Sequence, residues 1–368
     1  MTRFSRPLIT WLCPMIVSMG CAPPLSAEPG SPAVFTSYDA DGEVKGNPFR
    51  ARLGKPLAGG GFRLDSYHLW DPSVIKVGDQ YHLFASCWSG DFSNWKQSYI
   101  IRAVSDNLLG PYEFAGEVFR ARGEGFFDAI GCHNPKITSH DGRYYLYYIG
   151  VPAYESGVAV SDSIEDPWVR QPGPEIPANN PALWVHEDGS VYGLRRVKVE
   201  NPNFDPTREK SGTRNPDRLL HLQALRAESI FGPYTVLHGE GEHALPENFE
   251  VEDPCVWRRH GRYHVLLNDW GGHATGHWKA ITYYTSENGL SYDLVSDEPV
   301  LIRSEPVRFA DGSEQTFARI ERPNIVLDEQ GDVVAMLVAC LPEDQSEGSR
   351  IVIFPVDHFD GTRESIDR

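Results

Sequence analysis

Short apolar runs alternate with polar turns along most of the chain, and one arrangement of them recurs five times. Each copy starts with two residues, most of them polar, that lead into a proline and then into an apolar run typical of a β-strand. The five starts are Trp70-Asp71-Pro72, His133-Asn134-Pro135, Asn179-Asn180-Pro181, Glu252-Asp253-Pro254 and Glu321-Arg322-Pro323. Recurrence on this scale indicates a repeat architecture in which each copy forms one supersecondary unit.

Each copy continues as a β-hairpin followed by further strands. A turn that contains glycine separates the first apolar run from the second, as at Gly78 and Gly142, and such a turn marks a hairpin. A third run and a short closing segment follow in the first four copies, whereas the fifth copy ends after its third run. Five such units predict an all-β fold, a five-bladed β-propeller, in preference to a β-sandwich. We expect residues 51–64 to supply the missing outer strand of the fifth blade.

The first 27 residues have the pattern of an export signal. Arg3 and Arg6 precede an apolar run at residues 8–20, which is too short to span a bilayer. Two cleavage sites fit the sequence: one before Cys21, which would then carry a lipid anchor, and one after Ala27. The protein is therefore expected to be exported, and to be periplasmic, anchored to the outer membrane or secreted.

The remainder of the chain divides into a linker and one catalytic domain. We expect an N-terminal linker at residues 28–50 and the propeller at residues 51–360. The polar residues 201–217, rich in proline and arginine, predict an insertion in the third blade that lies on one face of the propeller.

Composition narrows the range of partners. The formal net charge is −17, which repels polyanions, so nucleic-acid binding is not expected. The four cysteines beyond the signal lack metal-binding spacing and lie in apolar runs, and we expect buried thiols and neither a metal nor a cofactor. They are Cys87, Cys132, Cys255 and Cys340.

The residues at the five starts are the candidates for chemistry. The first strand of each blade lies nearest the propeller axis, so the starts converge on one funnel. Proline disfavours helical conformations in the residue before it, and we expect that residue to be extended and to present its side chain alike in each blade. The funnel then collects Asp71, His133, Asn134, Asn179, Asn180, Glu252, Asp253, Glu321 and Arg322.

Carboxylates gathered in one funnel favour acid–base chemistry, because each raises the pKa of its neighbours. Glycoside hydrolysis needs one carboxylic acid to protonate the leaving oxygen and a second carboxylate to activate water or to attack the sugar. The sequence therefore predicts that Asp71, Glu252 and Asp253 are catalytic. The other funnel groups are expected to contact a carbohydrate substrate: His133, Asn134, Asn180, Glu321 and Arg322.

The blade-one and blade-four starts, with Tyr263, resemble signatures of glycoside hydrolase family 43, whose five-bladed propellers form one superfamily with the family 117 enzymes. The resemblance implies that Asp71 is the general base and Glu252 the general acid of an inverting hydrolase. Family 43 enzymes carry an aspartate that modulates pKa where this chain has Asn180. That departure leaves room for a different acid.

Family 117 enzymes use a histidine as the acid. By this resemblance, His133, His273 and His277 are alternatives for that role, and a hydrogen-bonding role is the other interpretation of each.

Further residues suit a sugar or an acidic substituent. Arg195, Arg196 and Arg322 are candidates to bind a carboxylate or sulfate, with ion pairs inside the funnel as the alternative. Trp70 is a candidate to stack on a sugar ring. The glycine-rich residues 269–278 predict a flexible loop over the funnel.

Two other functions fit the same fold. A glycoside phosphorylase would need a cationic phosphate pocket, for which Arg195 and Arg196 are candidates. A non-catalytic carbohydrate-binding propeller would place its carboxylates too far apart to act on one bond. Export favours hydrolysis, because sugar phosphates are useful mainly inside the cell.

Overall fold

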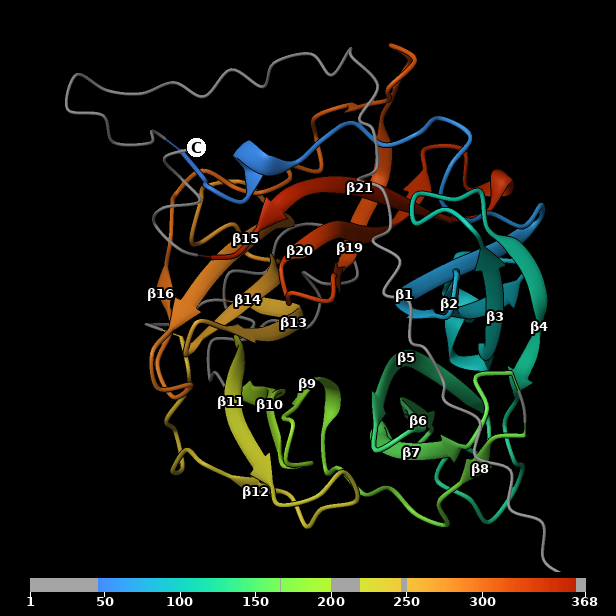
Figure 1. Ribbon diagram of the computed structural model, residues 1–368, viewed down its shortest axis with the longest axis vertical. Coiled ribbons are helices and arrows are strands. Elements are labelled where there is room, and N and C mark those ends of the chain that lie inside the picture. The colour runs from blue at the N-terminus through green and yellow to red at the C-terminus, as the bar shows by residue number, and fades with distance from the viewer. Residues whose placement is uncertain (1–45, 166, 200–218, 246–249, 362–368) are drawn as a thin grey trace, which may run out of the picture. The chain divides into compact units, whose positions relative to one another are not determined.

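The computed structural model describes residues 46–165, 167–199, 219–245 and 250–361. Figure 1 shows five antiparallel sheets arranged around a common centre, coloured in chain order from blue to red. In each sheet the strands follow one another in sequence. The predicted five-bladed β-propeller is therefore confirmed. The proposed signal, most of the linker and the insertion at 201–217 lie outside the described residues.

The first three blades have four strands each. Blade one contains β1 (Tyr67–Val77), β2 (Gln80–Ser89), β3 (Tyr99–Ser105) and β4 (Glu113–Phe119). Blade two contains β5 (Gly131–His140), β6 (Arg143–Val151), β7 (Glu155–Ser161) and β8 (Val169–Arg170). Blade three contains β9 (Asn179–Val185), β10 (Val191–Val199), β11 (Leu219–Ala227) and β12 (Thr235–Val236).

Blade four also has four strands, whereas blade five has three. Blade four contains β13 (Val251–Arg259), β14 (Arg262–Asp269), β15 (Ala280–Ser286) and β16 (Asp293–Leu294). Blade five contains β19 (Phe317–Leu327), β20 (Val333–Pro342) and β21 (Arg350–Phe359), and a small hairpin precedes it, β17 (Val307–Arg308) with β18 (Glu314–Gln315). The described 3-10 turns are η1 (Arg50–Arg52), η2 (Phe92–Gln97) and η3 (Gln345–Glu347).

The N-terminal segment covers the outer edge of blade five. Phe62 and Leu53 form antiparallel bridges to Ile351 and Val356 of β21, so the predicted closure by residues 51–64 is confirmed, although as two bridges and not a continuous strand. Phe49 is fully buried in the core beside blades four and five. The described residues before position 51 therefore also pack with the propeller.

Every inner strand carries the same β-bulge at its proline. In blade one the ladder pairs Trp70 with Ser86 and Ser73 with Phe84, so two residues of β1 lie opposite one residue of β2. The other four blades show the same shift around their prolines. Because proline has no N–H, its place in the bulge loses no hydrogen bond of the ladder.

The residue before each of these prolines adopts a left-handed backbone conformation. Its φ lies between 54° and 61° in all five blades, at Asp71, Asn134, Asn180, Asp253 and Arg322. The expectation of an extended conformation was wrong, because the bulge turns this residue out of the ladder. Its equivalence across the blades is confirmed. Left-handed backbone costs most residues roughly 1–2 kcal/mol and Asp or Asn less, and such strain concentrates at functional sites.

The core lies between the blades, and the four cysteines belong to it. All four are buried and free, as expected. Burial raises the pKa of the Cys87 and Cys255 thiols to about 11, so these thiols stay protonated. Within the described ranges, no helix is long and apolar enough to cross a bilayer.

Candidate active site

The five bulge residues form a closed ring around the propeller axis. The backbone N–H of Asn134 donates to Asp71 Oδ2 (3.2 Å), and Asn134 Nδ2 donates to Asn180 Oδ1 (2.7 Å). Asn180 Nδ2 donates in turn to Asp253 Oδ1 (2.6 Å). Arg322 closes the ring, with Nη1 at 2.9 Å from Asp253 Oδ1 and Nε at 3.0 Å from Asp71 Oδ1. One side chain from each blade therefore takes part in a single buried network.

Asp71 is held in its ionised form. It is fully buried. It accepts a hydrogen bond from Ser86 Oγ (2.7 Å), and its Oδ2 atom lies 3.0 Å from His133 Nε2. Burial alone would raise the pKa of Asp71, but the charges of Arg322 and His133 and these hydrogen bonds hold it well below its usual range.

Asp253 has the opposite electrostatic character. Burial raises the pKa of Asp253 above its usual value, the Arg322 guanidinium only partly offsets this effect, and Glu321 adds to it. Its Oδ2 atom is buried and has no hydrogen-bond partner among the described residues. Two carboxyl groups of one ring thus have pKa values displaced in opposite directions, the arrangement that separates an acid from a base.

Glu252 lies beside the ring but points to another partner. It is buried, directly before the bulge of β13, and it forms an ion pair with Arg196 of β10 in blade three. Glu252 still pairs in the ladder, whereas the bulge turns Asp253 out of it, so the same short segment gives the two adjacent carboxyls different surroundings.

Glu321 forms a second charged cluster with two cations. Its Oε1 atom lies 2.9 Å from Lys279 Nζ and 3.3 Å from Arg319 Nη1. Burial would raise the pKa of Glu321, but these cations lower it, and burial lowers the pKa of Lys279. The Lys279 ammonium also lies 3.5 Å from the centre of the Trp270 ring, a cation–π contact that helps to offset its burial.

Sequence reasoning missed Lys279 and Lys136. Lys279 ends the glycine-rich loop between β14 and β15, which starts at the ladder end that carries the β13 bulge. Lys136 follows Pro135 in β5, and its charge interacts with those of Asp71 and Asp253 while burial lowers its pKa. A charged residue inside the apolar run after a repeat proline was a visible signal for Lys136.

His133 is the predicted histidine that contacts the ring. Besides Asp71 Oδ2, it meets Ser98, whose Oγ lies 3.0 Å from His133 Nδ1. The Trp95 ring packs against it at 5.2 Å between ring centres. His273 lies in the loop between β14 and β15, where its backbone N–H donates to Asp269 Oδ1 (3.0 Å).

Two predicted substrate contacts lie elsewhere. Trp70 is only 3% exposed and packs edge-to-face on Phe92 in the core, so it presents no ring face to a sugar. Arg195 Nη2 donates to Gln223 Oε1 (2.8 Å), whereas its neighbour Arg196 turns to Glu252. Trp70 is therefore part of the hydrophobic core. Arg195 lies on the opposite side of β10 from Arg196, and so points away from the ring.

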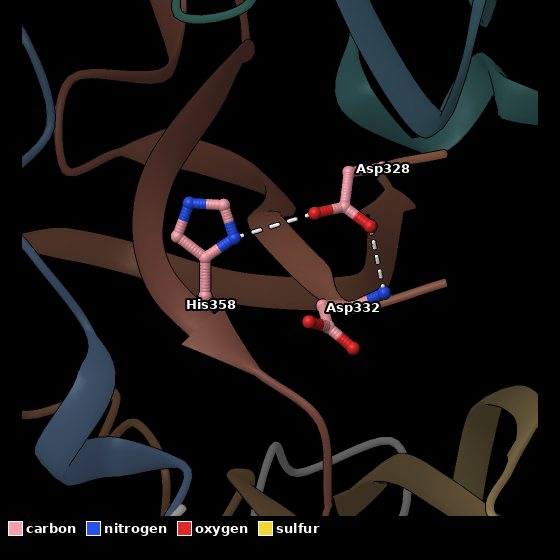
Figure 2. A group of neighbouring side chains, drawn as sticks. All are labelled: Asp328, Asp332 and His358. Atoms are coloured by element: carbon pink, nitrogen blue, oxygen red, sulfur yellow. Dashed lines mark hydrogen bonds and ion pairs between the residues drawn. The ribbon is translucent and has the colours of Figure 1, made fainter. Parts of the chain in front are cut away.

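A group of potential metal ligands lies in blade five, away from the ring. Figure 2 shows Asp328, Asp332 and His358 at the hairpin between β19 and β20 and the end of β21. Asp328 Oδ1 accepts the backbone N–H of Asp332 (2.9 Å), and Asp332 Oδ1 lies 2.6 Å from Arg259 Nη2. These carboxylates close a turn and an ion pair, so the group carries no metal proposal.

No protein-family model matches the chain, but two curated proteins are similar to parts of it. An extracellular endo-α-(1→5)-L-arabinanase of Thermotoga petrophila is 30% identical over 158 residues, 37% of this chain and 30% of that protein. A xylan 1,3-β-xylosidase of a Vibrio species is 23% identical over 256 residues, 63% of this chain and 41% of that protein. The chain thus spans less than half the length of these curated relatives.

Solved structures of glycoside hydrolases share the fold. The family 117 enzyme Zg3597 of Zobellia galactanivorans superposes with a TM-score of 0.58 at 14% identity, over 84% of this chain and 91% of that one. A thermostable family 43 enzyme gives 0.57 at 15% identity, over 80% and 92%. The GH43_1 enzyme of Xanthomonas citri, solved with xylose, gives 0.54 at 17% identity, over 81% and 91%. At the level of the fold, the resemblance to families 43 and 117 is confirmed.

Proposed function

We propose that this five-bladed propeller hydrolyses glycosidic bonds of an oligo- or polysaccharide. The observation that carries the proposal is the ring, in which Arg322 bridges the buried carboxyls of Asp71 and Asp253. Its partners hold Asp71 ionised, while burial raises the pKa of Asp253. The arabinanase and xylosidase relatives, and the glycoside hydrolases that share the fold, support the same reaction class.

Asp71 is assigned as the base that holds and orients the attacking water. Ser86, His133 and Arg322 fix its carboxylate, so little reorganisation is needed when the sugar arrives. The low pKa of Asp71 keeps it ionised over a wide pH range. Its contribution is therefore mainly one of position and charge.

Blade four supplies the proton donor. Glu252 is the first candidate, because the resemblance to family 43 implies it. Asp253 is the second candidate, because its pKa is raised and one of its oxygens has no protein partner within the described ranges. Arg196 beside Glu252 favours the ionised form of that carboxyl, which opposes its role as the acid.

The reaction is proposed to invert the anomeric configuration. An inverting pair stands roughly 6.5–9.5 Å apart to leave room for water, against about 5–5.5 Å for a retaining pair. The base on blade one and the donor on blade four come from blades that are not neighbours, which suits the larger separation. NMR of the first-formed anomer tests this assignment, and a retained anomer would contradict it.

Turnover of a panel of aryl glycosides and plant and algal oligosaccharides tests the function, with Asp71→Asn as the inactive control. The assay is run with and without inorganic phosphate, because a phosphorylase would depend on it. Phosphate-independent release of reducing sugar is expected. No release from any member, or release only with phosphate, would contradict hydrolysis.

Export is part of the same proposal and rests on the pattern of the first 27 residues. The alternatives are a lipid anchor on Cys21 and cleavage after Ala27. Mass spectrometry of the mature N-terminus from the producing cell distinguishes them, and an unprocessed Met1 would contradict export.

A further inference from the structure

A cavity lies at the other end of two inner strands, away from the ring. It measures about 660 Å³ and is lined by the end of β9 with the following hairpin, and by residues of β13 and β14. The ring residues Asn180 and Asp253 lie near the starts of β9 and β13, whereas Trp184 and Arg258 lie near their ends. At roughly 3.3 Å per residue, the cavity is well separated from the ring.

The polar groups of this cavity have few protein partners. Within the described part of the chain, the side chains of Glu187 and Arg258 form no hydrogen bond or ion pair, and neither do the His186 ring and the Tyr263 hydroxyl. Arg258 instead lies over the Tyr263 ring, 5.6 Å from its centre. In the ring of bulge residues on the propeller axis, by contrast, every charged side chain is paired.

The lining chemistry identifies a class of ligand. Trp184 and Tyr263 are partly buried aromatic residues of the lining, and the Tyr263 ring also packs on Tyr192 at 4.1 Å between ring centres. Glu187 and Asp188 place carboxylates in the same cavity as Arg258, although Asp188 Oδ1 already accepts hydrogen bonds from Ser190 N and Oγ. An anion would meet the two carboxylates, and a cation would meet the guanidinium. Hydroxyl groups satisfy both, since they donate to a carboxylate and accept from a guanidinium, while the C–H face of a sugar ring packs on an aromatic side chain.

The state of His186 supports this interpretation. Burial lowers the pKa of its imidazole, and the charge of Arg258 lowers it further. His186 is thus a neutral group that offers one donor and one acceptor at neutral pH, as suits an uncharged ligand.

We propose that this cavity is a second, non-catalytic binding site for a neutral saccharide unit. The saccharide class rests on the proposed function, whereas the site itself does not depend on the roles of the ring residues. Such a site would hold a polysaccharide chain while the ring acts on another part of it, and so raise the local concentration of substrate.

The test measures binding in two inactive backgrounds, Asp71→Asn and Glu252→Gln. If one of these variants fails to fold, the other still gives the result. Each background is probed on an array of neutral plant and algal oligosaccharides, and each positive glycan is titrated by calorimetry. The cavity variant carries Arg258→Ala and Glu187→Gln. Arg308→Ala is the matched control, because this arginine is exposed and far along the chain in the β17–β18 hairpin.

Two classes of binding site are expected in the backgrounds and in the control, and one class in the cavity variant, with at least a tenfold loss of affinity at the second site. Thermal melting confirms that each variant is folded. The site would be overturned if the cavity variant and its background gave identical isotherms. It would also be overturned if the cavity substitutions weakened the binding of none of the saccharides. Cavity-dependent binding without turnover of any glycoside would instead overturn the proposed function and leave the site standing.

Discussion

The two ends of the inner strands treat polar side chains in opposite ways. At the bulge end, Asp71 and Asp253 are buried, and the partly buried Arg322 binds both of them across blades. At the hairpin end, Glu187 and Arg258 line an open cavity and have no side-chain partner within the described residues. Paired and buried charges are oriented in advance and have displaced pKa values, as catalysis requires. Unpaired polar groups leave their donors and acceptors available to a ligand.

The largest expected effect is the loss of the cation that closes the ring. Arg322→Gln leaves Asp71 and Asp253 buried without their shared partner, and removal of one member of a buried ion pair costs about 3–5 kcal/mol. Chemical denaturation at pH 7 should show this loss of unfolding free energy. The exposed Arg308→Gln is the control, since its ion pair with Glu314 is at the surface and is worth little.

The same variant has a defined pH dependence. The folded-state pKa of Asp71 is lowered, so its stabilising effect is present above the ordinary carboxyl pKa of about 3.9 and is lost as the pH falls below it. The deficit of Arg322→Gln should therefore be greatest near neutral pH and shrink below about pH 4. A deficit that grows on acidification would contradict the assigned ion pair.

Removal of the base is the next largest effect. Asp71→Asn keeps the shape of the side chain but removes the charge that orients water, and we expect kcat to fall by at least about a hundredfold. Circular dichroism should show a folded protein. A variant with near-normal kcat on the best glycoside would show that the ring is structural and not catalytic.

Blade four offers a sharper comparison between two adjacent carboxyls. If Glu252 is the acid, Glu252→Gln should lower kcat about a hundredfold on substrates with poor leaving groups, and much less on an activated aryl glycoside that needs no proton. Asp253→Asn should then affect both substrates alike. The reverse pattern would assign the proton donor to Asp253 and the Arg196 partner of Glu252 to a structural role.

The smallest effect is expected at the cavity end. Arg258→Ala removes no hydrogen bond or ion pair that the described residues provide, so its free energy of unfolding should stay within about 0.5 kcal/mol of the parent. Denaturation beside Arg322→Gln measures both ends in one assay. A loss of several kcal/mol in Arg258→Ala would show that this guanidinium is paired after all.

Prediction from the sequence worked best for the repeat and the residues that it brings together. A proline at the same place in each copy marked Asp71, Asn134, Asn180, Asp253 and Arg322 as equivalent, and the structure joins all five. It failed for their backbone, because the β-bulge depends on how a second strand pairs with the first. It also failed for Trp70, since an aromatic residue in a strand becomes either core or binding surface according to what packs on it.

The sequence by itself therefore determined the number of blades, the segment that closes the last one, and the inner residues that meet on the axis, because these follow from periodicity and turn chemistry along the chain. Only the tertiary structure decided which carboxyl is ionised and which has a raised pKa. Those shifts come from burial and from charges on other blades, such as Arg322 beside Asp71, and no local pattern records which distant side chain a carboxylate will face. The same reason kept Lys279 and the cavity of blades three and four out of reach of the sequence, whereas Lys136 was marked by its place after a repeat proline.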